Sequence, residues 1–109
     1  MDIIKSSRGN TPILQLKGRF DAHEIAPVRV WFNEQFEAGQ IHLVVNLGEV
    51  NFIDSSALST LVQGLKHCRE KGGELSLCVL QQPVRVIFEL TRLDKAFSIY
   101  ADEESACNG

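Results

Sequence analysis

The pattern of hydrophobic and polar positions divides the chain into alternating strand-like and helix-like segments. Residues 41–47 and 74–80 are nearly continuous runs of apolar and β-branched residues, which is typical of strands covered on both faces. Residues 1–7 and 12–17 are separated by turn residues and are predicted to form a hairpin whose first strand lies at the edge of a sheet. A short strand is expected at 96–100.

The first helical segment should begin between Glu24 and Pro27, because proline fits only the first turn of a helix. It should end near Ala38 and Gly39. Its spacing predicts that Trp31 lies at the margin of an inward stripe, which is formed by Ile25, Val28, Phe32 and Phe36.

The second helical segment, residues 55–71, has the clearest helical spacing in the chain and ends at two consecutive glycines. Its apolar positions are Leu58, Leu61, Val62, Leu65 and Cys68. A third helix is predicted over residues 84–90, directly after Pro83.

This order of segments predicts an α/β fold, with a mixed sheet of four to five strands and about three to four helices packed mainly over one face. Gly48 and Glu49 should interrupt the chain before residues 50–53 lead into the second helix. The strands on either side of that helix are expected to be parallel neighbours. Residues 1–100 should form one domain, followed by a frayed acidic tail at 101–109.

Composition excludes several classes of protein. The 109 residues are 44% hydrophobic and 23% charged, which is ordinary for one globular domain. A net charge of −3 without a basic run argues against nucleic-acid binding. No signal peptide or membrane-length apolar segment is visible. Three cysteines without C-x-x-C spacing are typical of reduced thiols, so we expect a soluble cytoplasmic protein without a membrane partner.

The candidate chemistry lies where residues 50–53 meet the second helix. Asp54, Ser55 and Ser56 stand at the predicted helix N-terminus, where free N–H groups and the helix dipole favour caps and anions. From spacing alone, a plain capping role for Ser55 is the more frequent case. However, the junction has more capping side chains than a helix needs, and Ser59 and Thr60 continue the hydroxyls along a first turn expected to be exposed. This surplus favours Ser55 as a phosphorylation site offered to a partner protein.

Asp21 and Asp54 permit two interpretations. They could converge at one end of the sheet and help a partner enzyme bind or activate Ser55, or they could be two independent helix caps; the spacing alone favours the caps. The sequence shows no nucleophile–base pair, phosphate loop or acidic cluster with metal-ligand spacing. We therefore expect no enzymatic activity, no cofactor and no metal.

Several segments together resemble the STAS domain of bacterial anti-sigma factor antagonists. The most specific is Asp54-Ser55-Ser56-Ala57-Leu58, and the others are residues 18–23, 44–47, 50–53, 72–75 and 93–97. The resemblance spans nearly the whole chain. Ala57 replaces a glycine that is common in the family, and Pro27 is atypical.

In that family, a kinase of the histidine-kinase-like ATPase fold phosphorylates the serine that follows the aspartate, and a PP2C-type phosphatase reverses the reaction. The resemblance implies that Ser55 is the acceptor, flanked by Asp21, Asp54 and the hydroxyl of Ser56. It thus implies an antagonist that binds an anti-sigma factor/serine kinase while Ser55 is unphosphorylated.

Two other functions stay open at this point. One is a nucleotide- or small-anion-binding module that uses Asp21, Asp54 and the N-terminus of the second helix. The other is a structural STAS subunit of a larger complex, in which Ser55 is never modified.

Overall fold

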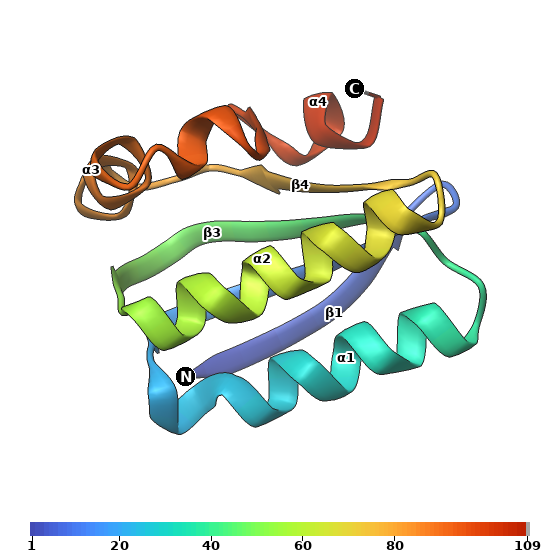
Figure 1. Cartoon of the computed structure of the whole chain (residues 1–109), viewed down its shortest axis with the longest axis horizontal. Coiled ribbons are helices and arrows are strands. Elements are labelled where there is room, and N and C mark those ends of the chain that lie inside the picture. Colours follow the sequence, from blue (N-terminus) through green and yellow to red (C-terminus); the bar gives the residue numbers. More distant parts are fainter. Residues whose placement is uncertain (109) are drawn as a thin grey trace.

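Five strands form one mixed sheet in the computed structural model, which describes residues 1–108. The strands lie in the order β1-β2-β3-β4-β5, with an antiparallel hairpin at one edge and parallel pairs from β2 onwards (Figure 1). Their bounds are β1 Asp2–Arg8, β2 Thr11–Phe20, β3 His42–Ile53, β4 Glu74–Cys78 and β5 Ser98–Tyr100.

The helices alternate with the strands, and α1 and α2 lie side by side across one face of the sheet (Figure 1). Two 3-10 turns, η1 and η2, precede α1 and β5. The bounds are η1 Ala22–Glu24, α1 Ile25–Glu37, α2 Ser55–Glu70, α3 Gln82–Leu90, η2 Leu93–Lys95 and α4 Glu103–Asn108. The predicted α/β architecture is therefore confirmed. Over residues 1–108, none of the helices has the length and apolar character needed to cross a bilayer.

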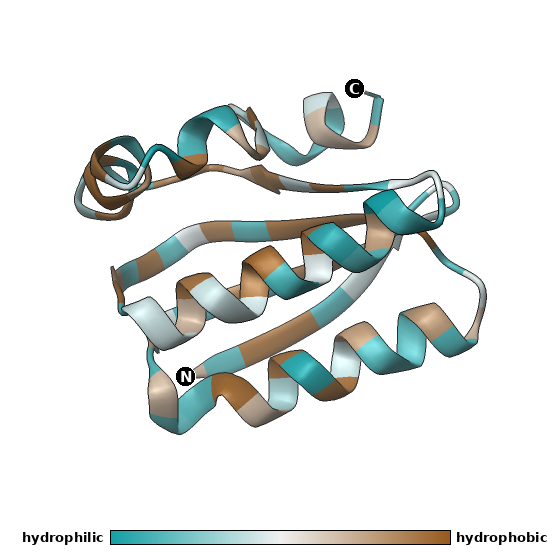
Figure 2. Cartoon of the chain, viewed as in Figure 1, coloured by the Kyte–Doolittle hydropathy of each residue, from teal (hydrophilic) through white to brown (hydrophobic). Residues whose placement is uncertain are grey.

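Side-chain alternation along β3 creates two hydrophobic cores of different size. Leu43, Val45 and Leu47 point into the main core, which α1, α2 and α3 cover. Val44 points to the other face, where it packs with Ala106 of α4 in a small second cluster. Figure 2 shows hydrophobic positions recurring along α2, and a continuous hydrophobic stretch near the start of β3, where both faces of the strand are covered. The larger core therefore fixes the position of α2.

The prediction that Trp31 lies at the margin of α1 is wrong. Its side chain is 1% exposed and packs beside Phe32 in the main core, with 5.6 Å between the ring centroids. Phe36 is partly buried, packs against the main core and stacks on His67 of α2 with 3.8 Å between the ring centroids. The fully buried stripe is thus Val28, Trp31 and Phe32, with Ile25 and Phe36 packed at its edges, because α1 packs against both the sheet and α2.

The expected interruption at Gly48 and Glu49 is also wrong, since β3 continues through both residues to Ile53. The irregularity remains as a bulge in β3: between the pairs Gln15–Asn46 and Lys17–Glu49, β3 has one residue more than β2. The side-chain oxygen of Asn46 accepts a hydrogen bond of 2.8 Å from the Gly48 N–H. The strand therefore delivers the chain without a break to the start of α2.

Residues 103–108 form the helix α4, in contrast to the frayed tail expected at 101–109; Gly109 lies outside the described residues. Asp102 accepts a hydrogen bond of 2.7 Å from the Ser105 N–H and so caps α4. Glu103 accepts a hydrogen bond of 2.7 Å from the side-chain amide of Asn46, and Ala106 is buried. These contacts hold α4 on the second face of the sheet.

Replacing Trp31 with alanine should lower the free energy of unfolding by about 3–5 kcal/mol, the usual cost of removing a buried aromatic side chain. Val30→Ala is the matched control, because Val30 is the adjacent residue of α1 and is 53% exposed. Its effect should stay within about 0.5 kcal/mol. Urea unfolding measures both changes, and similar midpoints for the two variants would contradict this assignment of the core.

Candidate functional site

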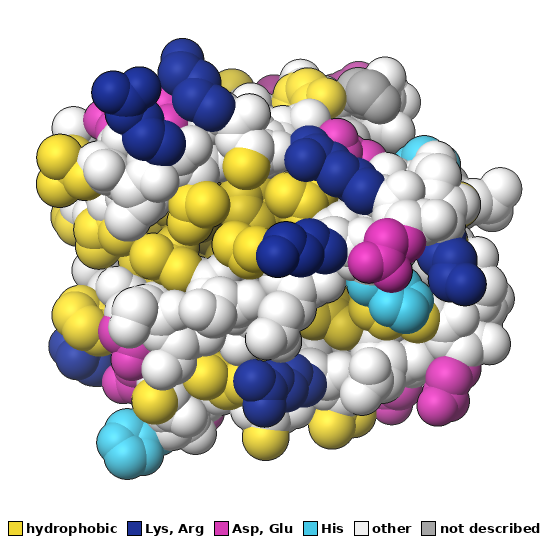
Figure 3. Space-filling view, in the orientation of Figure 1, with side chains coloured by type: hydrophobic (Ala, Val, Ile, Leu, Met, Phe, Trp, Pro, Cys, Tyr) yellow, Lys and Arg dark blue, Asp and Glu magenta, His cyan; other side chains and the backbone are white. Residues whose placement is uncertain are grey.

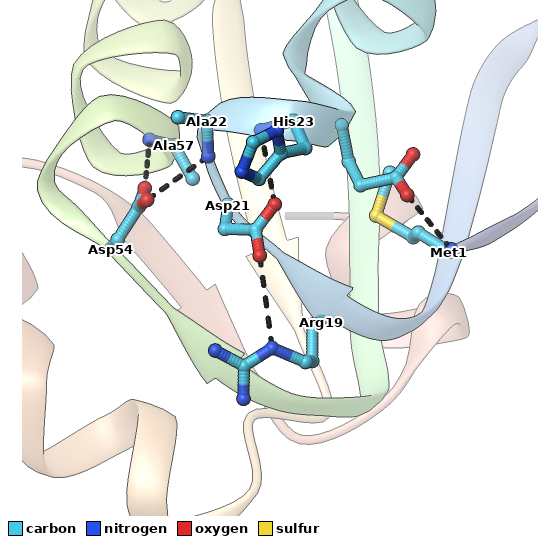
Figure 4. Close-up of polar contacts among 8 residues, drawn as sticks. Met1, Arg19, Asp21, Ala22, His23, Asp54 and Ala57 are labelled. Carbon is cyan, nitrogen blue, oxygen red and sulfur yellow. Dashed lines mark hydrogen bonds and ion pairs between the residues drawn. The ribbon is translucent and has the colours of Figure 1, made fainter.

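Asp54 connects the start of α2 to the turn between β2 and α1, at the end of the sheet where both lie. It lies between β3 and α2 in an extended conformation, with φ −109° and ψ 179°. One oxygen of its carboxylate accepts a hydrogen bond of 2.9 Å from the Ala57 N–H, and the other accepts one of 3.0 Å from the Ala22 N–H (Figure 4). The first bond caps α2, and the second holds the turn between β2 and α1 against it.

Asp21 lies in the turn between β2 and α1. Its carboxylate accepts a hydrogen bond of 3.1 Å from the His23 N–H and forms an ion pair of 3.7 Å with Arg19 (Figure 4). The Arg19 guanidinium lies 3.9 Å from the centre of the Phe52 ring, a cation–π contact between the ends of β2 and β3. Both acids are therefore caps, as the spacing favoured. They are not independent, because Asp54 bonds to the turn that Asp21 opens.

Ser55 is the first residue of α2 and is exposed. Its hydroxyl forms no hydrogen bond to any other part of residues 1–108. Ser59, one turn further along the helix, is exposed as well. The structure thus presents two hydroxyl-bearing side chains on the outer side of the first turns of α2.

The expectation that Thr60 extends this exposed surface is wrong. Thr60 is 1% exposed, and its hydroxyl donates a hydrogen bond of 3.0 Å to the carbonyl oxygen of Ser56. It lies on the side of α2 that faces α1, where it lines a pocket between the two helices instead of the outer surface that carries Ser55. Ser56 itself is partly buried. The accessible residues among those predicted are therefore Ser55 and Ser59, with Asp21, Asp54 and Ser56 only partly exposed.

The N-terminus of α2 is already occupied by a negative charge. The hydrogen bond from the Ala57 N–H is the main cause that holds the pKa of Asp54 below its ordinary value of 3.8, with a smaller contribution from the Ala22 N–H. Asp54 is therefore ionised at neutral pH and uses the groups that a bound anion would need.

The described residues give little support for a metal site or for a reactive cysteine. Within residues 1–108, no group of three or more His, Cys, Asp and Glu side chains is arranged to hold a metal ion. Burial raises the pKa of Cys68 to about 11 and that of Cys78 to about 12, so both thiols are poor nucleophiles at neutral pH.

A shallow groove of about 260 Å³ lies beside the exposed hydroxyls, between α2 and η2. We call it the α2–η2 groove; it is lined by Leu58, Ser59, Val62, Gln63, Lys66 and Leu93. Figure 3 shows hydrophobic side chains gathered between α2 and α3, with Lys and Arg side chains at the border. Sequence analysis missed this groove, because it forms only when η2 packs beside α2.

The family model for the STAS domain matches residues 2–106. The chain therefore belongs to the STAS domain family. It is 33% identical over 95 residues to an anti-sigma F factor antagonist from Paenibacillus polymyxa, covering 86% of this chain and 81% of that protein. It is 32% identical over 72 residues to the putative anti-sigma factor antagonist BtrV from Bordetella bronchiseptica, covering 66% of this chain and 62% of that protein.

Solved structures show the same fold. A putative anti-sigma factor antagonist from Thermotoga maritima superposes with a TM-score of 0.91 at 24% identity, over 97% of this chain and 92% of that one. The antagonist SpoIIAA in its unphosphorylated form gives a TM-score of 0.75 at 15% identity, over 98% and 96% of the two chains. The phosphorylated form of SpoIIAA, from Bacillus, gives 0.77 at 19% identity, over 98% and 97%.

Replacing Asp54 with asparagine should make the stability of the protein less dependent on acid pH. Because the folded-state pKa of Asp54 is lowered, its carboxylate contributes stability above the ordinary value of 3.8, and this contribution is lost as the pH falls through the lower folded-state pKa. The wild-type protein should therefore be the more stable at neutral pH, and the difference should shrink below pH 3.8.

Urea unfolding over a series of pH values measures this difference. Asp2→Asn is the control, because Asp2 is an exposed residue of the edge strand. A difference between wild type and Asp54→Asn that stays constant through the acid range would contradict the role given to the Asp54 charge.

Proposed function

We propose that this chain is a non-enzymatic antagonist of an anti-sigma factor, switched by phosphorylation of Ser55. Unphosphorylated Ser55 permits binding to an anti-sigma factor that is also a serine kinase of the histidine-kinase-like ATPase fold. Phosphorylation releases this partner, and a PP2C-type phosphatase restores the binding form. One observation carries the proposal: the Ser55 hydroxyl is exposed and unbonded within residues 1–108, whereas the side chains of Asp54 and Thr60 beside it are bonded within the fold.

The proposed switch does not require refolding. A phosphoryl group adds about −1.5 to −2 charges at neutral pH. The dipole of α2 would favour this charge by about 0.3–1 kcal/mol, and the neighbouring Asp54 carboxylate would oppose it. That SpoIIAA has been solved in both forms, with similar TM-scores of 0.75 and 0.77 against this chain, supports a fold that tolerates the modification.

The partner surface is therefore the place where phosphorylation acts. A contact shaped for a hydroxyl must accommodate a dianion and its water. A loss of about 3–4 kcal/mol in binding would reduce affinity several hundred-fold. The α2–η2 groove lies beside Ser59, so its apolar lining is available to the same partner.

Binding of a nucleotide or small anion at the α2 N-terminus is less well supported. Such a ligand would need backbone N–H groups, but the Asp54 carboxylate already accepts hydrogen bonds from the Ala57 and Ala22 N–H groups. An anion would also meet the negative charge of Asp54. The geometry therefore favours a protein partner.

Ser55→Ala should retain binding to the cognate kinase, while Ser55→Asp should bind at least about ten-fold more weakly, because it places a negative charge where the hydroxyl stood. A calorimetric titration with the purified kinase measures both. Ser7→Asp is the matched control and should bind like the wild type, since it adds the same charge at an exposed serine of the edge strand β1, away from α2. Equal affinities of Ser55→Ala and Ser55→Asp for the kinase would contradict the proposed switch.

Protein isolated from cells should carry one phosphoryl group on Ser55 under some growth or stress conditions. Intact-mass measurement followed by peptide mapping detects this group, and Ser55→Ala should abolish it. If Ser55 were unmodified under every condition in which the kinase is present, the chain would instead be a structural subunit of a larger complex.

A further inference from the structure

The second face of the sheet carries a cleft of about 530 Å³ at the end opposite Ser55. Its floor is formed by the first residues of β3, β4 and β5, and α4 and the turn between β1 and β2 complete it. Among the side chains that line it are Thr11, Val44, Ser76, Tyr100 and Cys107. The volume lies in the range of small-molecule sites. The cleft is separate from the Ser55 surface, because β3 begins at the cleft and ends at Ile53, two residues before Ser55.

Ser76 is the polar group that points to a ligand. Its neighbours Leu75 and Leu77 are in the main core, so strand alternation directs Ser76 to the cleft. Ser76 is only 7% exposed, and no group in residues 1–108 forms a hydrogen bond with its hydroxyl. The hydroxyl reaches the cleft, where a ligand that replaces water can donate a hydrogen bond to it or accept one from it.

Asn46, another buried polar residue on this face, shows a different arrangement. Its amide nitrogen donates to Glu103 at 2.7 Å, and its oxygen accepts from Gly48 at 2.8 Å. The fold therefore satisfies the buried polar group beneath α4 and leaves the one in the cleft available.

The charges around the cleft restrict the class of ligand. Within residues 1–108, its lining includes the imidazole of His42 but no Lys or Arg side chain, so an anionic ligand would find no ammonium or guanidinium counter-charge. Glu74 is the only carboxylate in the lining, and it is bonded to Arg69 at 2.9 Å and Ser98 at 3.4 Å. A cationic ligand would have to compete with Arg69 for it. An uncharged ligand avoids both costs.

We propose that this cleft binds a small uncharged ring compound that carries amide or hydroxyl groups. The partly exposed ring of Tyr100 provides an apolar contact for the ring, above a floor closed by the buried side chains of Val44 and Ala106. The hydroxyls of Ser76 and Thr11 provide hydrogen bonds to its polar groups. This site is independent of the switch proposed for Ser55.

Amide NMR titrations with benzamide, nicotinamide and p-hydroxybenzamide test the proposal on the full chain, with benzoate as the anionic counterpart of benzamide. At least one uncharged compound should give saturable shifts at residues of β3, β4, β5 and α4 that line the cleft. Benzoate should bind at least about ten-fold more weakly than benzamide. Absence of saturable shifts at the cleft for all three compounds, or equal binding of benzoate, would overturn the proposal.

Ser76→Ala removes the hydroxyl and adds no bulk, and should weaken binding about three- to ten-fold, the usual effect of one hydrogen bond. Ser76→Cys, which keeps the number of side-chain heavy atoms but has only a weak donor, is a second variant if alanine disturbs the sheet. Ser59→Ala, on the outer side of α2, is the control and should bind like the wild type. Unchanged affinity in a folded Ser76 variant would remove Ser76 from the site and overturn the proposal.

Discussion

The carboxylate of Asp54 is the interaction on which the candidate site depends. By accepting hydrogen bonds from the Ala57 and Ala22 N–H groups, it fixes where α2 begins and holds the turn that precedes α1 against that start. Ser55 is consequently the first helical residue and points away from the fold. Because Asp54 supplies the cap, the Ser55 hydroxyl is not needed for it.

This arrangement explains how a rigid domain can present a modifiable group. The main core holds α2 from below through residues such as Leu61 and Leu65, which are almost completely buried. The outer side of the same helix carries Ser55 and Ser59, which make no contribution to that core. A change of charge on the outer side can therefore alter recognition without loosening the packing that positions it.

The second face of the sheet is organised by a different contact, between Asn46 and Glu103. This hydrogen bond and the packing of Ala106 hold α4 over part of the face and leave the cleft beside it. The two faces thus differ in kind: one is closed by long helices with large apolar stripes, and the other is only partly covered by a six-residue helix. Ser55 and the cleft lie at opposite ends of β3, so the two sites can be perturbed separately.

The sequence by itself determined the order of the strands and longer helices from β1 to β5, the limits of α1 and α2 to within one or two residues, and the position of Asp54 and Ser55 at the start of α2. These features depend on local periodicity, capping residues and proline, which act over a few neighbouring positions. Tertiary structure decided the burial of Trp31 and Thr60, because both depend on how α1 packs against α2. It also decided that β3 continues to Ile53, because β2 pairs with it over this length. It decided that α4 packs on the second face, because Asn46 bonds to Glu103, 57 positions further along the chain. The α2–η2 groove and the cleft were decided in the same way, since each is lined by segments that only packing of the whole domain brings together.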